Sequence, residues 1–385
     1  MDYMLTEEQI MIRDLARQIA VEKIVPVRAE LDEQNKYPRD IMKAMAQADL
    51  FALFIPEEYG GLGKKSLELC ITVEELSKAC VGVATTYASS ALGTYPILLY
   101  GSEEQKKKFL PDVASGKSLV AFGLTEANAG SDASGIQTTA KLEGNEYVLN
   151  GTKQWITNGG EAELYTIIAI TDRSKGPRGA SAFIVEKGTP GFTFGKKENK
   201  MGIRASSTTE LIFNNCRIPK ENLISKQGMG FIIAMKTLDS SRTGVGAMGV
   251  GVAQGAIDEA ISFAKNRVQF GQPITSFQAI QHMFADMQTQ TEAACSLVYS
   301  VARFIDSGAK DFSRASAMAK LFGTDVSMKV TTDAVQIMGG SGYMKEYPVE
   351  KMMRDAKILQ IFEGANQIQR NVIALDMIRE ATRAK

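Results

Sequence analysis

The chain has 385 residues, and its 44 lysines and arginines balance 44 aspartates and glutamates to give a formal net charge of zero. This length exceeds the roughly 250–300 residues that one hydrophobic core supports, which predicts two or three packed subdomains. The neutral balance, with no run of one sign at either end, disfavours nucleic acid or an anionic membrane as the main partner. No stretch approaches the roughly 18 apolar residues of a membrane span, so we expect no membrane insertion.

Cysteine and histidine limit the chemistry. The four cysteines are scattered without a CxxC pair or metal-ligand spacing, which predicts buried free thiols in a reducing cytosol and no metal. The single histidine, His282, disfavours a histidine-rich metal site or a Ser/His/Asp triad, and we interpret it as a packed or half-exposed helix residue. Acid–base chemistry then falls to a carboxylate, Lys, Tyr or Cys.

Helical patterns fill the first part of the chain. Thr6 and Gln9 form a capping box at the start of the first helix. Further helices are predicted over 39–53, 66–79 and 102–115, separated by turns that carry Pro and Gly. The pattern predicts an all-α domain over residues 1–117.

Short runs of β-branched and aromatic residues begin at about residue 118. The dipeptide Asn150-Gly151 separates two such runs and predicts a hairpin turn there. Other strands are predicted over 164–171, 181–186 and 209–213. We expect a small antiparallel β-barrel or sandwich domain over residues 118–229.

Helical periodicity returns after Gly230 and continues to the C-terminus. The predicted helices cover 231–268, 277–307, 311–338 and 364–382, which is typical of a four-helix bundle. The fold class is therefore α+β and multidomain, with a C-terminal four-helix-bundle domain over 230–385.

Residues 244–249 match the glycine fingerprint of dinucleotide-binding folds, but the context is wrong for that site. A Rossmann site needs a strand before the glycines, whereas residues 232–238 have a helical pattern. We interpret these glycines as a helix face that lets another backbone or a ligand come close.

Three other segments carry polar groups in unusual settings. Residues 122–132 join a strand to a glycine turn whose N–H groups and hydroxyls suit a polar ring edge or a phosphate, although such a turn taken alone is more often a surface turn. Residues 267–281 combine an arginine suited to phosphate with a turn and repeated glutamines. Residues 336–343 form a helix end and a glycine loop, for which a helix C-cap is the simple explanation. Trp155 taken alone fits core packing.

Glu363 lies between Phe362 and Gly364, next to the apolar residues Ile358, Leu359 and Ile361. Desolvation in such surroundings raises the pKa of a carboxylate and makes it a stronger base. Any glutamate taken singly is more often an exposed helix residue. Glu363 therefore indicates a catalytic base only in combination with the segments above.

Together these segments resemble the acyl-CoA dehydrogenase family over essentially the whole chain. Residues 122–132 are similar to its first flavin and substrate signature, 155–157 to its flavin strand, 238–242 to its CoA-contact helix and 362–364 to its catalytic turn. The resemblance implies a helical, β and helical three-part fold. It also implies FAD, bound non-covalently at a subunit interface of a homotetramer.

The resemblance assigns roles to individual positions. The cofactor-binding residues would be Phe122, Leu124, Thr125, Gly130, Ser131, Trp155, Ile156, Thr157, Arg267, Phe270, Gln278, Gln336, Gly339, Gly340, Ala365 and Gln367. Arg267, Phe270, Gln278 and 336–340 would reach the FAD of a neighbouring subunit. Ser131, Asp239, Arg242 and Gly364 would contact the CoA substrate. Ala365 and Gln367 depart from the Thr and Glu of many members, which weakens their assignment.

The implied reaction is α,β-dehydrogenation of an acyl-CoA. Glu363 would take the α-proton while the β-hydride passes to flavin N5, giving a trans-2-enoyl-CoA, and donors around the carbonyl would stabilise the enolate-like charge. Some members carry the base one residue before the CoA-binding arginine, but here that residue is Ser241. No Lys or Arg occurs between Lys78 and Lys106, which disfavours a decarboxylating glutaryl-type enzyme.

Three alternatives remain at this point. The expected function is a dehydrogenase of short, medium, branched or cyclic acyl-CoAs in carboxylic acid degradation, which passes electrons to an electron-transfer flavoprotein. The others are an acyl-CoA oxidase and a catalytically silent flavoprotein scaffold. The expected location is the bacterial cytoplasm, or the mitochondrial matrix if a transit peptide has been removed.

Overall fold

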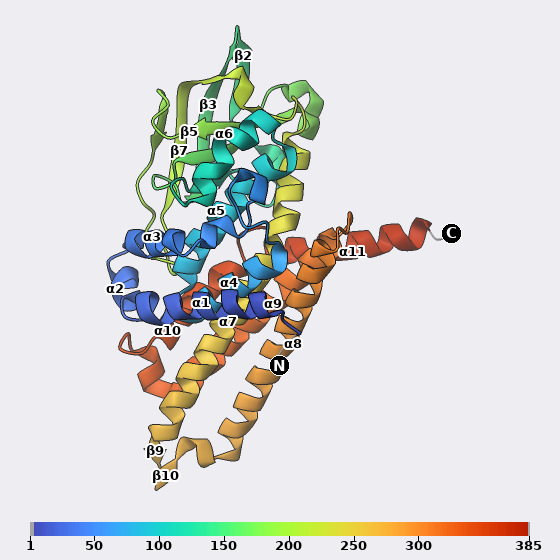
Figure 1. The fold of residues 1–385 in the computed structure, drawn as a ribbon. Helices are drawn as coiled ribbons and strands as arrows, with labels where there is room; N and C mark the ends of the chain where they lie inside the picture. Colours follow the sequence, from blue (N-terminus) through green and yellow to red (C-terminus); the bar gives the residue numbers. More distant parts are fainter. Residues whose placement is uncertain (1–3, 384–385) are drawn as a thin grey trace.

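The computed structural model describes residues 4–383, so the outermost residues of the predicted first and last domains lie outside the described part. Helices, then a sheet, then helices follow one another along the chain (Figure 1). The predicted three-part α+β architecture is therefore confirmed.

The N-terminal helices surround a core of apolar side chains. Their bounds are α1 (Glu7–Ile19), α2 (Arg28–Glu33), α3 (Arg39–Gln47), α4 (Ser66–Ala79), α5 (Val81–Tyr100) and α6 (Glu103–Ala114). The capping box of Thr6 and Gln9 is present at α1. Helix α5 was not predicted. Its side chains are small or apolar on almost every side, so no amphipathic period marks it.

The sheet domain is mostly antiparallel, as predicted, but it also contains parallel strand pairs. Its strands are β1 (Val120–Gly123), β2 (Thr139–Glu143), β3 (Glu146–Thr157), β4 (Leu164–Ile170), β5 (Ala180–Glu186), β6 (Phe192–Phe194), β7 (Thr208–Pro219) and β8 (Leu223–Ile224). The order is β6-β7-β3-β2-β4-β5-β8, and β1 also pairs with β4. The pairs β1–β4 and β2–β4 are parallel. Parallel pairing is possible because other strands lie between the partners in the chain: the β2–β3 hairpin separates β1 from β4, and β3 separates β2 from β4.

The predicted hairpin turn at Asn150-Gly151 is wrong. Both residues lie inside β3, where the pairing with β7 shifts register between Leu149 and Gly151. The turn is one strand length earlier, where Gly144 has a φ of +64° between paired Glu143 and Glu146. The permissive backbone that Asn-Gly signals is used here for a β-bulge.

The C-terminal part contains α7 (Gly230–Asn266), α8 (Gln278–Asp306), α9 (Ser313–Met338), α10 (Val349–Leu359) and α11 (Asn366–Arg383). The short hairpin β9 (Val268–Gln269) and β10 (Gln272–Pro273) joins α7 to α8. Helix α10 was not predicted, and it packs across α7 and α9. In Figure 1, α7 runs from the sheet to the β9–β10 tip, and α11 extends away from the body.

Glycines allow α7 and α9 to pack closely. A Cβ on Gly246 would lie 2.8 Å from the carbonyl oxygen of Ala319, and one on Gly249 would lie 2.5 Å from that of Gly323. The glycines of 244–249 therefore lie within one continuous helix, and Gly246 and Gly249 allow another backbone to come close, as predicted from the sequence.

Gly93 of α5 provides a test of the packing between the first helical domain and the sheet. A Cβ there would lie 2.9 Å from the backbone nitrogen of Ala121 in β1. We predict that Gly93→Ala lowers the free energy of unfolding by about 1–3 kcal/mol, measured by denaturant titration, because the overpacking outweighs the better helix propensity. Gly244→Ala is the matched control, since its Cβ meets nothing within 4 Å. Equal stability of the two variants would contradict this packing account.

Candidate active site

One cavity collects most of the predicted site residues. It has a volume of about 210 Å³ and is lined by residues of α5, the sheet domain, α7 and the segment after α10. The predicted residues in its wall are Phe122, Leu124, Thr125, Gly130, Ser131, Trp155, Ile156, Thr157, Arg242, Glu363 and Gly364. Residues far apart in the sequence thus meet at one place.

Glu363 lies in the turn between α10 and α11 and is half-buried. Its φ is +52°, and that of Gly364 is +92°. A left-handed backbone at a glutamate is uncommon and is held only by surrounding structure. Leu359 is fully buried, whereas Ile361 is 53% exposed. The expected apolar surroundings are therefore only partly present, because Ile361 points outward.

Burial raises the pKa of the Glu363 carboxyl, and three groups oppose that effect. The hydroxyl of Ser241 on α7 donates a hydrogen bond to Oε2 of Glu363. The positive charges of Lys320 and Arg242 also favour the ionised form. The carboxylate is thus an ionisable base in a desolvated position. Ser241, which was excluded as a base, contacts this carboxylate directly.

The backbone N–H of Glu363 donates to no other described residue. This donor sits in the same turn as the carboxylate. It can therefore donate a hydrogen bond to a ligand carbonyl oxygen on which negative charge develops, without first breaking a protein hydrogen bond.

Arg242 is almost fully buried on α7, and its Nη1 donates to Oδ1 of Asp239 at 2.5 Å. Its Nε has no partner in the described part of the chain. Arg242 lines the cavity and Asp239 does not. The Nε of Arg242 is therefore a buried donor available to a ligand. A contact of Asp239 with CoA stays a prediction.

The wall formed by the sheet suits a planar, polar-edged ring. Trp155, the only tryptophan in the chain, is 56% exposed and has a φ of +58°, so it does not pack in the core. The side-chain hydroxyls of Thr125 and Thr157 have no hydrogen-bond partner among residues 4–383. A Cβ on Gly130 would meet nothing within 4 Å. An exposed indole beside free hydroxyls and an open glycine turn fits the isoalloxazine of a flavin.

A buried ion pair supports this wall, and sequence analysis missed it. Nζ of Lys153 donates to Oε1 of Glu126 at 2.7 Å and to the carbonyl of Leu124 at 3.1 Å. Glu126 also accepts from the backbone N–H groups of Gln137 and Thr138. Burial lowers the pKa of Lys153 to about 8. In the sequence, the pair is visible only as Glu126 and Lys153, two charged residues within segments that are otherwise rich in small and aromatic residues.

Other predicted residues lie outside the cavity. Phe270, between β9 and β10, is 93% exposed, and Arg267 and Gln278 are also exposed. These three lie at the tip of α7 and α8, remote from the sheet (Figure 1). Gln336, Gly339 and Gly340 are exposed at the end of α9, where Gly339 caps the helix. Ala365 and Gln367 do not line the cavity.

The cavity also contains residues that were not predicted as site residues. Thr85 and Ser89 come from α5, and Met235 comes from α7. The Thr85 hydroxyl contacts the sulfur of Met248 at 3.8 Å, and this contact joins α5 to α7. Thr85 and Ser89 were missed together with α5 itself.

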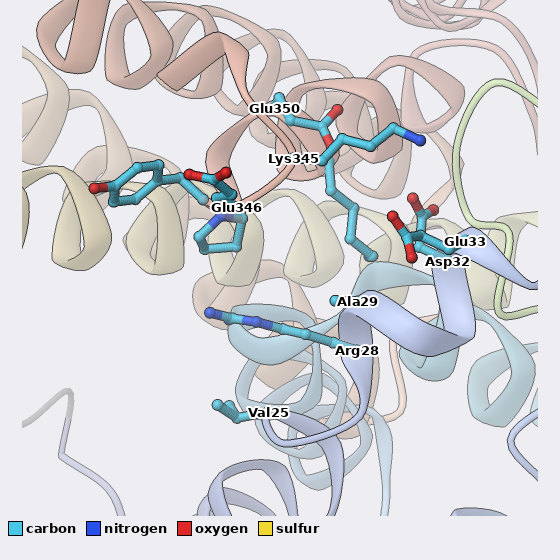
Figure 2. A pocket seen from close by; sticks show the side chains of 11 residues that line it. Val25, Arg28, Ala29, Asp32, Glu33, Lys345, Glu346 and Glu350 are labelled. Atoms are coloured by element: carbon cyan, nitrogen blue, oxygen red, sulfur yellow. The ribbon is translucent and has the colours of Figure 1, made fainter. Parts of the chain in front are cut away.

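A second cavity of about 120 Å³ lies between α2 and the segment before α10 (Figure 2). Its lining is charged, but Arg354 pairs with Asp32 and Glu350, and Arg28 pairs with Glu259. No predicted site residue lines it. No cluster of His, Cys, Asp and Glu within residues 4–383 could hold a metal ion. In the same range, no helix has both the length and the apolar character of a membrane span.

Family models match three consecutive parts of the chain. The N-terminal, middle and C-terminal domains of acyl-CoA dehydrogenases match residues 6–117, 121–216 and 228–378. The chain therefore belongs to the acyl-CoA dehydrogenase family, and the expected class of oxidoreductase is confirmed.

Three solved structures resemble this chain. A chain from a structure of the electron-transferring flavoprotein of Acidaminococcus fermentans is 50% identical, with a TM-score of 0.96 and coverage of 98% of this chain and 100% of that chain. Butyryl-CoA dehydrogenase from Megasphaera elsdenii is 45% identical, with the same TM-score and coverage. An acyl-CoA dehydrogenase from Bacillus anthracis, in complex with FAD, is 37% identical, with a TM-score of 0.94 and coverage of 100% and 69%.

The buried pair under the cavity wall can be tested by removing its cation. We predict that Lys153→Met lowers the free energy of unfolding by roughly 3–5 kcal/mol, because it leaves Glu126 as a buried charge without its counter-ion. Denaturant titration measures the loss. The double variant Lys153→Met/Glu126→Gln should recover part of it. Lys175→Met, which breaks a surface pair with Asp172, should leave stability unchanged. A Lys153→Met variant as stable as Lys175→Met would contradict the role of the pair.

Proposed function

We propose that the protein oxidises an acyl-CoA thioester to the trans-2-enoyl-CoA, with Glu363 as the base that removes the α-proton. The observation that carries this proposal is the Glu363 carboxylate in the wall of the main cavity, partly desolvated and contacted by Ser241. The raised pKa of this carboxyl makes it a stronger base than a solvated glutamate. Membership of the acyl-CoA dehydrogenase family supplies the substrate class.

The residues of the cavity wall suit FAD as the cofactor, with Leu124, Thr125, Trp155 and Thr157 against its ring. When bound, FAD supplies a hydride acceptor for the β-carbon. The chain supplies the rest: Glu363 takes the proton from the α-carbon, and its own N–H stabilises charge on the thioester oxygen. Arg242, with its unpartnered Nε, holds polar groups of the CoA arm.

We place the substrate among short, straight acyl groups. The relative from Megasphaera elsdenii acts on butyryl-CoA, and its match covers 98% of this chain. In this chain, the contact between Thr85 and Met248 joins two walls of the cavity, and both residues are nearly fully buried. A longer acyl chain would have to displace packed side chains there.

We further propose an electron-transfer flavoprotein as the electron acceptor, a homotetramer as the assembly and the bacterial cytoplasm as the location. The similarity to a chain from the electron-transferring flavoprotein structure supports the acceptor. The assembly would place the exposed Phe270, Arg267 and Gln278 against the cofactor of a neighbouring subunit. Exposed apolar residues of α11, such as Leu375 and Ile378, offer additional surface for subunit contact.

An anaerobic titration tests the function directly. The flavin absorbance of the purified protein is followed while acyl-CoA thioesters of increasing chain length are added. We expect butyryl-CoA to bleach the flavin, and octanoyl-CoA or longer thioesters to bleach it more slowly. If no thioester bleaches it, the dehydrogenase proposal fails. Rapid reoxidation by oxygen with release of peroxide would favour the acyl-CoA oxidase alternative.

Replacement of the proposed base gives a second test. Glu363→Gln should retain FAD and acyl-CoA binding but lose flavin reduction by several orders of magnitude in stopped-flow measurements, because an amide cannot accept the proton. Glu346→Gln, at an exposed glutamate, is the control. In the wild type, the reduction rate should fall as the pH falls through the pKa of Glu363, at a pH above the ordinary glutamate value of about 4.3. Wild-type reduction rates in Glu363→Gln would show that another base acts.

A further inference from the structure

Lys320 lies directly beneath the turn that carries Glu363. It belongs to α9 and is fully buried. Its Nζ donates to the carbonyl oxygen of Gly364 at 2.8 Å and to Oδ1 of Asn366 at 2.7 Å. No carboxylate oxygen of the described chain lies within 4.0 Å of this amine. A buried lysine therefore binds neutral acceptors one and three residues after the proposed base.

Fold stability does not account for this lysine. Burial of an ammonium group without a carboxylate is costly, and here it lowers the pKa of Lys320 to about 7. Both acceptors have other donors, because Nε2 of Gln369 donates to the Gly364 carbonyl at 2.9 Å and the Thr324 hydroxyl reaches Oδ1 of Asn366 at 3.3 Å. A methionine of similar length would fill the same volume and leave neither acceptor without a partner.

The two ends of the turn also bind α9 through hydrogen bonds that do not involve Lys320. Asn366 donates to Asp325 at 2.7 Å, and Gln360 donates to the same carboxylate oxygen at 2.7 Å. Lys320 also binds Asn366, and through the Gly364 carbonyl it contacts the middle of the turn, next to Glu363, where the backbone has a positive φ. The feature that Lys320 adds is thus a donor and a charge at the position of the base.

Charged and titratable groups approach Glu363 from each packed element. Arg242 comes from α7, Lys320 from α9, and the phenol of Tyr95 from α5. Lys320 is in turn influenced by Glu363, Arg242 and Asp325. Asp239 neutralises much of the charge of Arg242 through their hydrogen bond. Lys320 is therefore the cation near Glu363 that has no carboxylate bonded to it.

We propose that Lys320 is a positioning residue for Glu363: it holds the Gly364 carbonyl from beneath the turn, and its positive charge favours the ionised carboxylate. This inference rests on the proposed role of Glu363 as the base. It assigns to α9 a part in the reaction, although no α9 side chain lines the cavity.

The test is the pH dependence of flavin reduction by butyryl-CoA in Lys320→Met. The variant should fold, retain FAD and melt at or above the wild-type temperature, because a buried charge has been replaced by an apolar chain. Its acid limb should move to higher pH by about one unit, because the carboxylate has lost a nearby cation, and on that limb its reduction rate should fall by up to about tenfold. Lys329→Met, at a half-exposed lysine on the same helix that pairs with Asp333, should match the wild type.

The possible outcomes separate the claims. If no thioester bleaches the wild-type flavin, the proposed function itself fails. If the wild type is bleached and Lys320→Met has an unmoved acid limb, only the role of Lys320 is overturned. Lys320→Gln, which removes the charge but keeps a donor, should also move the limb. Loss of folding or of FAD in both variants would assign Lys320 a structural role and contradict the proposal.

Discussion

The close contact of α7 with α9 is the constraint on which the site depends. The two helices approach backbone to backbone at Gly246, Gly249 and Gly323, where any side chain would collide with a carbonyl group of the other helix. This proximity brings Ser241 and Arg242 on one helix and Lys320 on the other to the same short turn. Phe362 of this turn packs against the core, and hydrogen bonds from both helices hold the residues that follow it.

A balance of opposing effects at Glu363 follows from this arrangement. Burial favours the protonated acid, whereas the Ser241 hydroxyl and two cations favour the carboxylate. A base for a weakly acidic carbon needs both effects, because it must be basic and still ionised before the reaction. Two residues of the cavity wall, Glu363 and Trp155, also have positive φ values. Strain of this kind persists where the surroundings hold it in place.

The sequence alone predicted the order of helices and strands, the family and most of the residues in the cavity wall, because these depend on local patterns and motifs. It missed α5, whose small and apolar side chains hide a helical period, and it also missed the 11-residue helix α10. It placed a turn at Asn150-Gly151, where a permissive backbone serves a bulge. The supporting pairs Lys153–Glu126 and Lys320–Gly364 were also missed. Their partners lie 27 and 44 residues apart, and only the packing of separate elements brings them together.

Deuterium exchange at the α-carbon tests the central claim most directly, because it follows proton removal independently of the electron acceptor. Butyryl-CoA is incubated anaerobically in D₂O with the FAD-loaded protein, recovered and analysed by mass spectrometry. The account predicts that the wild type incorporates deuterium at the α-carbon and that Glu363→Gln incorporates none above the enzyme-free rate. Exchange by Glu363→Gln at the wild-type rate would contradict the assignment of Glu363 as the base.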